Sequence, residues 1–304
     1  MFIILKKFVL LHDFLAIRHK MSIKCKVLTG FIAIITLLSC RGKETPSSDP
    51  FPEEEEMEDS LTLQEEVEEE LVLREEDNPQ LDGVFNDFLF AYLHSRILRK
   101  ERTAMPLRLE HADRPTEVLD EFDAEFEFSF LSGEYFTTLY GNASQMQAED
   151  DEELEEDSIV SLQRINLNDG TIRNFLFQRE NGRWQLDAIR EATFADDALS
   201  DFLTFYARFC TDSLFQKQSI ANPLHIVVQD PDDEEANIDG IIDADQWQTF
   251  CSEVPSGIIS NIRKGQHYGG HRLVMRKSGL SNGLQEIFTF AKERAGWRLM
   301  KYEY

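Results

Sequence analysis

Two segments of equal length, FLFQRENGRWQL at residues 175–186 and FTFAKERAGWRL at residues 288–299, share one pattern of aromatic residues. In each, a Phe-x-Phe motif is followed by a Gly-containing turn and then by Trp-x-Leu. Large apolar residues that alternate with polar ones predict strands with one buried face. Each segment therefore predicts an antiparallel hairpin packed on a hydrophobic core.

The similarity continues outward from both hairpins. Upstream, Asp87-Phe88-Leu89-x-x-Tyr92 matches Asp201-Phe202-Leu203-x-x-Tyr206, and Lys100 with Pro106-Leu107 matches Lys217 with Pro223-Leu224. Three blocks in the same order, at separations between 113 and 117 residues, predict a tandem duplication with copies at 83–194 and 195–304.

Each predicted copy opens with a helix and closes with three strands. In the first copy Phe85, Phe88, Leu89 and Tyr92 recur at helical spacing. Asn-Gly and Asp-Gly pairs favour hairpin turns between the closing strands. The closing strands are expected at 159–166, 171–179 and 183–190, and at 271–277, 284–292 and 297–304. Pro106 and Pro223 are expected to start extended runs, and 116–122 and 243–251 to form middle helices.

The N-terminal region carries a localisation signal. Residues 21–40 read MSIKCKVLTGFIAIITLLSC: two lysines, an apolar run at 27–38, and Leu37-Leu38-Ser39-Cys40. The apolar run is short for a membrane span but suits a secretory signal. Its end resembles the lipobox of bacterial lipoproteins, which implies that Cys40 is acylated and becomes the first residue after cleavage. An ordinary signal with an incidental Cys is the alternative.

Further expectations follow for the ends of this signal region, residues 1–39. Met21 is the expected initiator, with a long signal beginning at residue 1 as the alternative. Position 41 after the cysteine is Arg, not the Asp that resembles an inner-membrane retention signal in some bacteria. This difference favours the outer membrane, with the protein either periplasmic or surface-exposed.

A highly acidic spacer is predicted between Cys40 and residue 82. Residues 53–77 hold 14 acids and one base, Arg74. Like charges at this density repel one another, which predicts a disordered, solvated tether. A docking tail for a basic partner is the alternative.

The helix, the extended run, the middle helices and the meander together resemble the nuclear transport factor 2-like (NTF2-like, cystatin-like) cone. The resemblance implies an α+β fold of two tandem cones, each with helices packed on a curved antiparallel sheet. With the signal and the spacer, the arrangement resembles an uncharacterised Bacteroidetes lipoprotein family, domain of unknown function 4348. That resemblance implies the fold and a location in the cell envelope, and no activity.

Charge and composition exclude several functions. The chain has 304 residues, 31 Lys+Arg against 57 Asp+Glu, and a net charge of -26. This balance argues against nucleic acid as a partner, because phosphate contacts need clustered bases. Neither a phosphate loop nor a nucleophile or zinc-protease motif is present. No cofactor or metal is expected.

Candidate site residues are few. Cys210 and Cys251 are a possible disulfide, with buried free thiols as the alternative. Tyr92 and Tyr206 lie on the apolar stripes of the opening helices and could face a pocket. His267 and His271 flank two glycines, so a flexible loop is preferred there over a metal site. The acidic runs 149–157 and 230–235 are interpreted as solvated loops instead of calcium sites.

Polar positions shared by both copies are also noted as candidates for chemistry: Asp87 and Asp201, Tyr92 and Tyr206, Lys100 and Lys217, and Arg179 and Lys292. No catalytic residue is assigned among them. The leading hypothesis is a non-catalytic, lipid-anchored envelope protein that binds a small molecule, a glycan or another protein. The alternatives are a small-molecule isomerase, dehydratase or hydrolase that uses a cone cavity, and a structural spacer.

Overall fold

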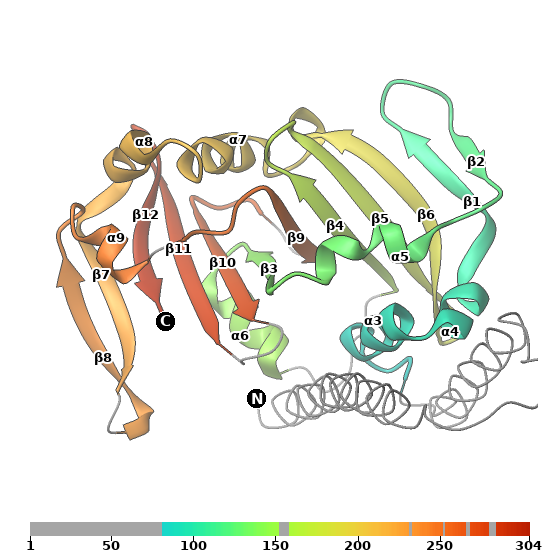
Figure 1. Ribbon diagram of the computed structural model, residues 1–304, viewed down its shortest axis with the longest axis horizontal. Helices are drawn as coiled ribbons and strands as arrows, with labels where there is room; N and C mark the ends of the chain where they lie inside the picture. The colour runs from blue at the N-terminus through green and yellow to red at the C-terminus, as the bar shows by residue number, and fades with distance from the viewer. Residues whose placement is uncertain (1–80, 152–157, 231–232, 252, 266–267, 280–283) are drawn as a thin grey trace, which may run out of the picture. The chain divides into compact units, whose positions relative to one another are not determined.

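The computed structural model describes residues 81–151, 158–230, 233–251, 253–265, 268–279 and 284–304. Within these residues the strands form two six-stranded sheets, here called sheet A and sheet B (Figure 1). Sheet A has the order β2 (Glu117–Leu119), β1 (Thr103–His111), β6 (Arg183–Thr193), β5 (Thr171–Glu180), β4 (Ile159–Asn166) and β9 (Ile258–Arg263). Sheet B has the order β3 (Tyr135–Tyr140), β10 (Arg272–Gly279), β11 (Gln285–Glu293), β12 (Gly296–Glu303), β7 (Ile220–Asp230) and β8 (Asp233–Ile242).

Short helices connect the strands. The first half of the folded region, residues 81–194, contains α3 (Phe85–His94), α4 (Arg96–Glu101), α5 (Ala124–Glu127), the 3-10 helix η1 (Ser129–Leu131) and α6 (Ala143–Asp151). The second half, residues 195–304, contains α7 (Ser200–Phe209), α8 (Ser213–Gln218) and α9 (Trp247–Phe250). The 3-10 helix η2 (Phe194–Asp196) lies at the junction between the halves. The α+β class is therefore confirmed.

The closing meanders form as predicted. β4, β5 and β6 pair in sequence order and antiparallel, and β10, β11 and β12 do the same. At the turn between β5 and β6, Asn181 has φ 50° and Gly182 has φ 82°. An Asn-Gly pair accepts this left-handed conformation at low cost, so the turn chemistry fixes the register of the hairpin.

The sheets are mixed, which corrects the expectation of antiparallel cones. β1 pairs with β6 in parallel, and β12 pairs with β7 in parallel. Each of these pairs joins elements that lie far apart in sequence, and such connections permit parallel pairing. Pro106 and Pro223 lie inside β1 and β7, and in each strand the register shifts across the segment that contains the proline. An irregularity in pairing is where a strand tolerates a residue without an N–H.

The predicted middle helices are only partly confirmed. Residues 116–122 contain the edge strand β2, so the helix expected there is wrong. The expected helix at 243–251 shortens to the four residues of α9. The apolar residues of the first segment have no neighbours at helical spacing on a buried face, and Val118 is exposed. Pairing with β1 therefore decides the conformation of this segment.

Two hydrophobic cores follow from this arrangement. The first packs α3 and α4 against sheet A, and Phe85, Phe88, Phe177 and Trp184 are among its fully buried side chains. The second packs α7 and α9 against sheet B, and it also contains Ile165, Leu167 and Ile172 from the meander of the first half. The Phe-x-Phe and Trp-x-Leu motifs supply residues to both cores, as the alternation predicted.

One strand of each half belongs to the sheet of the other half. β3 from the first half pairs with β10 in sheet B, and β9 from the second half pairs with β4 in sheet A. Figure 1 shows the green β3 beside the orange-red β10, and β9 beside the yellow-green β4. Each sheet is thus completed by an edge strand from the other half.

Candidate functional site

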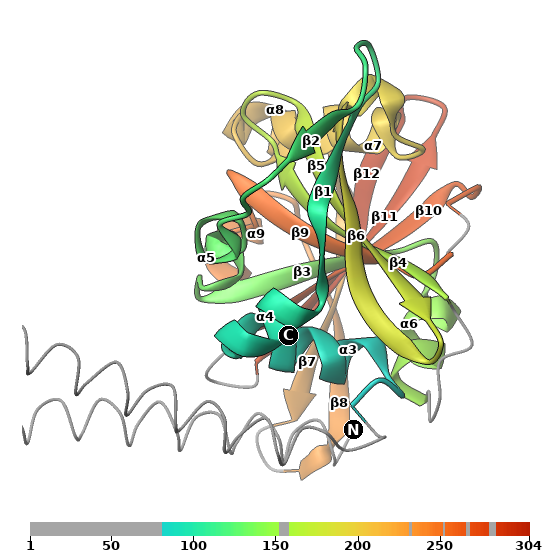
Figure 2. The same cartoon turned by 90° about the vertical axis from the view of Figure 1, so that its right-hand side faces the viewer.

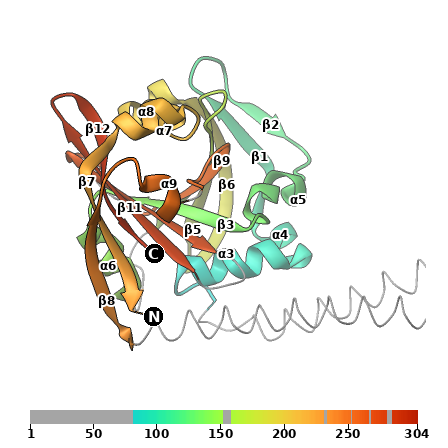
Figure 3. The ribbon, with the colours of Figure 1, turned by 60° about the vertical axis from the view of Figure 1, so that its left-hand side comes forward.

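An open cleft lies between α4 and α5, beside β1. Figure 3 shows the ribbons of these two helices next to each other, near β1. Its volume is about 360 Å³. The lining residues come from these three elements and from the approach to α5: Arg96, Arg99, Lys100, Thr103, Met105, Phe122, Asp123, Ala124 and Glu125. Pockets of this size accommodate small ligands.

The cationic wall of the cleft is one face of α4. Ser95 caps this helix, its hydroxyl accepting a hydrogen bond from the N–H of Leu98 at 3.1 Å, and Leu98 is buried in the first core. Burial of Leu98 leaves Arg96, Arg99 and Lys100 on the side that faces the cleft. The helix therefore concentrates three positive charges in a chain whose net charge is strongly negative.

Two of these cations are available to a ligand. Arg99 donates from Nη1 to the carbonyl of Leu93 at 2.6 Å, so this guanidinium is partly committed to the protein. In the described part of the chain, the exposed Arg96 and Lys100 side chains form no ion pair or hydrogen bond. An exposed cation without a partner can offer charge-assisted hydrogen bonds to a carboxylate or a phosphate.

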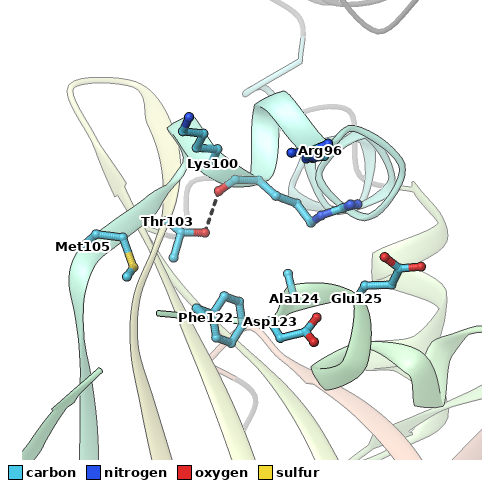
Figure 4. Close-up of a pocket in the computed structure, with 9 residues that line it drawn as sticks. Arg96, Lys100, Thr103, Met105, Phe122, Asp123, Ala124 and Glu125 are labelled. Carbon is cyan, nitrogen blue, oxygen red and sulfur yellow. Dashed lines mark hydrogen bonds between the residues drawn. The ribbon is translucent and has the colours of Figure 1, made fainter. Parts of the chain in front are cut away.

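The opposite wall is acidic. Asp123 caps α5, with Oδ1 accepting a hydrogen bond from the N–H of Phe126 at 3.0 Å, and Glu125 follows in the first turn. Figure 4 shows the Arg96 and Lys100 side chains on one side of the cleft and Asp123 and Glu125 on the other. The cleft is therefore polarised, with positive charge along α4 and negative charge along α5.

Apolar and hydroxyl groups form the base of the cleft. Met105 and Phe122 supply apolar surface between the two charged walls. The Thr103 hydroxyl donates to the carbonyl of Arg99 at 2.6 Å. Because its proton is used there, the Tyr92 hydroxyl is the donor in the 2.7 Å hydrogen bond between the two hydroxyls. These bonds fix the end of α4 and the start of β1.

Tyr92 and Tyr206, predicted as possible pocket residues, are both fully buried and neither lines this cleft. Burial raises the pKa of Tyr92 to about 12, so its hydroxyl stays protonated as a hydrogen-bond donor. The Tyr206 hydroxyl donates to the carbonyl of Pro255 at 2.9 Å, and burial also raises its pKa. Tyr92 supports the cleft indirectly, through Thr103.

Cys210 and Cys251 are free thiols in the structure, at the C-terminal caps of α7 and α9. The Cys210 thiol donates to the carbonyl of Ala207 and that of Cys251 to the carbonyl of Glu253. Burial raises the pKa of the two thiols to about 11 and about 12, which keeps both in the unreactive protonated form. The disulfide stays a prediction, and Cys40 lies outside the described residues.

The remaining candidates lie at separate places in the fold. Asp201 and Lys292, two of the polar positions shared by the halves, form an ion pair with each other. Lys100, a third shared position, lines the cleft. Among the described residues, no cluster of three or more His, Cys, Asp or Glu is arranged to hold a metal ion. Glu149, at the start of the first acidic run, lies in α6 and forms largely buried ion pairs with Lys264 and Arg276, so the solvated loop expected from residue 149 is wrong at this end. His267 is outside the described residues.

Sequence reasoning did not find the cleft itself. The signal that would have indicated it is the run Arg-Ile-Leu-Arg-Lys at residues 96–100, three cations within five residues of an acidic chain. The opposite wall carries no such signal, because α5 begins only at Ala124, beyond the helix that the sequence predicts at 116–122.

Comparison with known proteins places this fold among NTF2-like proteins. An NTF2-like protein from Bacteroides fragilis NCTC 9343 is 28% identical, with a TM-score of 0.65 over 74% of this chain and 96% of the other. The chain belongs to the DUF4348 family, a domain of unknown function, which it matches over residues 64–304. A search of curated proteins gave no match. No helix in the described residues has the length and apolar character needed to span a membrane.

Proposed function

We propose that this protein is a lipid-anchored binding protein of the bacterial cell envelope, and that the cleft between α4 and α5 binds a small ligand with an anionic group. The observation that carries the binding role is the pair of cations Arg96 and Lys100, which have no partner among the described residues and line an open cleft in an acidic chain. Because most of the chain is negatively charged, a local group of cations creates a positive potential that attracts anions to this place on the surface.

The acidic wall narrows the ligand class. Asp123 and Glu125 repel a ligand that is anionic throughout, and they attract an ammonium or a hydrogen-bond donor. Met105 and Phe122 favour an apolar segment between the two polar ends. We therefore expect a dipolar molecule, with a carboxylate or phosphate at α4 and an ammonium or hydroxyl at α5. Amino acids and short peptides have this chemistry.

Binding is tested with a panel of amino acids, dipeptides, simple carboxylates and phosphate esters, measured by isothermal titration calorimetry on the wild-type protein. The double variant Arg96→Ala/Lys100→Ala should bind the best ligand at least about tenfold more weakly, because charge-assisted hydrogen bonds are lost. Lys217→Ala is the matched control, since Lys217 occupies the corresponding exposed position of the second half. An equal loss in the control, or no binding in the panel, would contradict the proposal.

The acidic wall has its own variants. Asp123→Ser removes the charge but keeps a residue that can cap α5, so the helix should persist. Combined with Glu125→Gln, it should weaken dipolar ligands and strengthen ligands that are anionic only. This reversal of preference distinguishes a polarised cleft from a general anion site.

We further propose that the protein is an outer-membrane lipoprotein with Cys40 as its acylated residue, and that its two halves are duplicated NTF2-like cones. The lipobox-like sequence before Cys40 and the matching strand orders of the two sheets support these proposals. Cys40→Ser should abolish labelling by a radioactive or clickable fatty acid and release the protein from membranes. Unchanged membrane retention would contradict the anchor.

A further inference from the structure

The exchanged strands β3 and β9 contact each other where the two sheets meet (Figure 2). Thr137 of β3 and Ser260 of β9 form four reciprocal hydrogen bonds of 2.6 to 3.0 Å, in which each residue uses its hydroxyl and its backbone. Both residues are buried. Two edge strands are thus joined through side chains where they cannot share a backbone ladder.

A chain of buried amides continues from this contact into sheet A. Asn261 of β9 accepts from the N–H of Leu139 at 2.8 Å and donates to Gln163 at 2.8 Å. Gln163 in turn donates to Asn174 at 2.7 Å. Buried polar groups are costly unless they are satisfied, so this network favours one register of β3 against β9 over all others.

The exchange also moves apolar side chains between the cores. Leu139 belongs to the first half in sequence but is fully buried in the second core. Ile262 of the second half packs against the first core. Without its exchanged strand, each half would expose the edge of β4 or β10 as an unpaired template for another strand.

The exchanged strand β3 is connected to the cleft by the chain, because α5 shortly precedes it. The chain runs from α5 through η1 directly into β3, whose register is set by β10 of sheet B. Both walls of the cleft pack on the first core, α4 through Leu98 and α5 through Ala124. The acidic wall is in addition held at its C-terminal end by the second half, because its segment continues into a strand of sheet B.

We propose that the two halves are interlocked by reciprocal exchange of β3 and β9, each half binding the other by strand addition, and that the second half thereby fixes the C-terminal end of the segment that carries the α5 wall, in addition to the packing of α5 on the first core. The strand pairing alone supports the interlock. The importance of the α5 wall rests on the proposed function, but the position of this wall can be tested without a ligand.

The interlock is tested by cutting the connection between the halves. A protease site inserted between Asp196 and Asp197 keeps Thr193 and Asp196 together in one fragment and Asp197 and Arg263 together in the other. It interrupts the hydrogen bond from the N–H of Asp197 to the carbonyl of Phe194. After cleavage in native buffer, both fragments should elute together from gel filtration at the size of the uncut protein. Separation of the fragments, whether they remain folded or precipitate, would overturn the proposal.

Hydrogen exchange tests the contact itself. Thr137→Val keeps the shape of the side chain but removes its hydroxyl, and it should accelerate amide exchange about tenfold in β3, β9 and α5 together. Ser260→Ala is the milder second variant. Thr289→Val, on β11 and away from the contact, should leave these segments unchanged. Acceleration in β3 without β9 would overturn the interlock, and an unchanged α5 beside a faster β3 would overturn the role assigned to the wall.

Discussion

At the scale of single residues, one buried ion pair fixes the start of the folded region. Both carboxylate oxygens of Asp82 accept from the Arg102 guanidinium, at 3.0 and 3.1 Å, and Asp82 also accepts from the N–H of Trp184 at 2.8 Å. The Asp82 and Arg102 side chains are only 14% and 7% exposed. Asp82, taken from the sequence as the end of the acidic spacer, is therefore part of the first core's polar border.

We expect Asp82→Asn to lower the free energy of unfolding by about 3 kcal/mol, because it leaves a buried guanidinium without its counter-charge. Urea denaturation followed by circular dichroism measures this change. Asp201→Asn is the matched control: its ion pair with Lys292 has a carboxylate that is 75% exposed, and its loss should cost less than about 1 kcal/mol. Equal losses in the two variants would show that the Asp82 pair has no special role.

At the scale of elements, the placement of β3 in sheet B leads to a prediction that the sequence alone, which assigns β3 to the first half, would not give. Leu139→Ala changes the first half but removes a side chain from the second core, where it should cost about 2–5 kcal/mol. Amide exchange should then accelerate in β10 and β11 before it does so in β5 and β6. Val118→Ala, on the exposed edge strand β2, should cost less than about 0.5 kcal/mol. Faster exchange confined to sheet A would contradict the placement of Leu139.

The elements that could be predicted from sequence are those whose signals are local. Helical spacing at Phe85–Tyr92 and period-two alternation at Phe175 and Phe177 predicted α3 and the hairpin, and the Asn181-Gly182 pair predicted the turn. β3 and β9 could not be placed, because their partners lie more than ninety residues away and a strand carries no mark of which sheet it joins.

The cleft was missed for a related reason. Its cationic wall is a local feature of residues 96–100, but a cleft exists only where α5 stands opposite, and the position of α5 depends on β3. The sequence predicts Tyr92 and Tyr206 as possible pocket residues, because each carries a hydroxyl on the apolar stripe of a helix. The structure gives these hydroxyls partners inside the protein, Thr103 and the carbonyl of Pro255. In both tyrosines the hydroxyl on the buried face of the helix is explained by a hydrogen bond inside the protein, and not by a pocket.

At the scale of the whole molecule, the exchange of strands predicts that the two cores unfold together. Trp184 lies in the first core, whereas Trp247 lies in the second and Trp297 packs against it, so tryptophan fluorescence can report on each half separately. In Trp184→Phe the fluorescence reports on the second half, and in Trp247→Phe/Trp297→Phe it reports on the first. Circular dichroism reports on both halves in either protein.

Fluorescence and circular dichroism should give the same urea midpoint within each of these two variants, because sheet A cannot lose β9 without disrupting the second half, nor sheet B lose β3 without disrupting the first. The comparison is made inside one protein at a time, so any destabilisation by the tryptophan substitutions cancels. Two independent cones would instead give fluorescence curves that depart from the dichroism curve in opposite directions in the two variants. That result would mean that the exchanged strands do not couple the halves energetically.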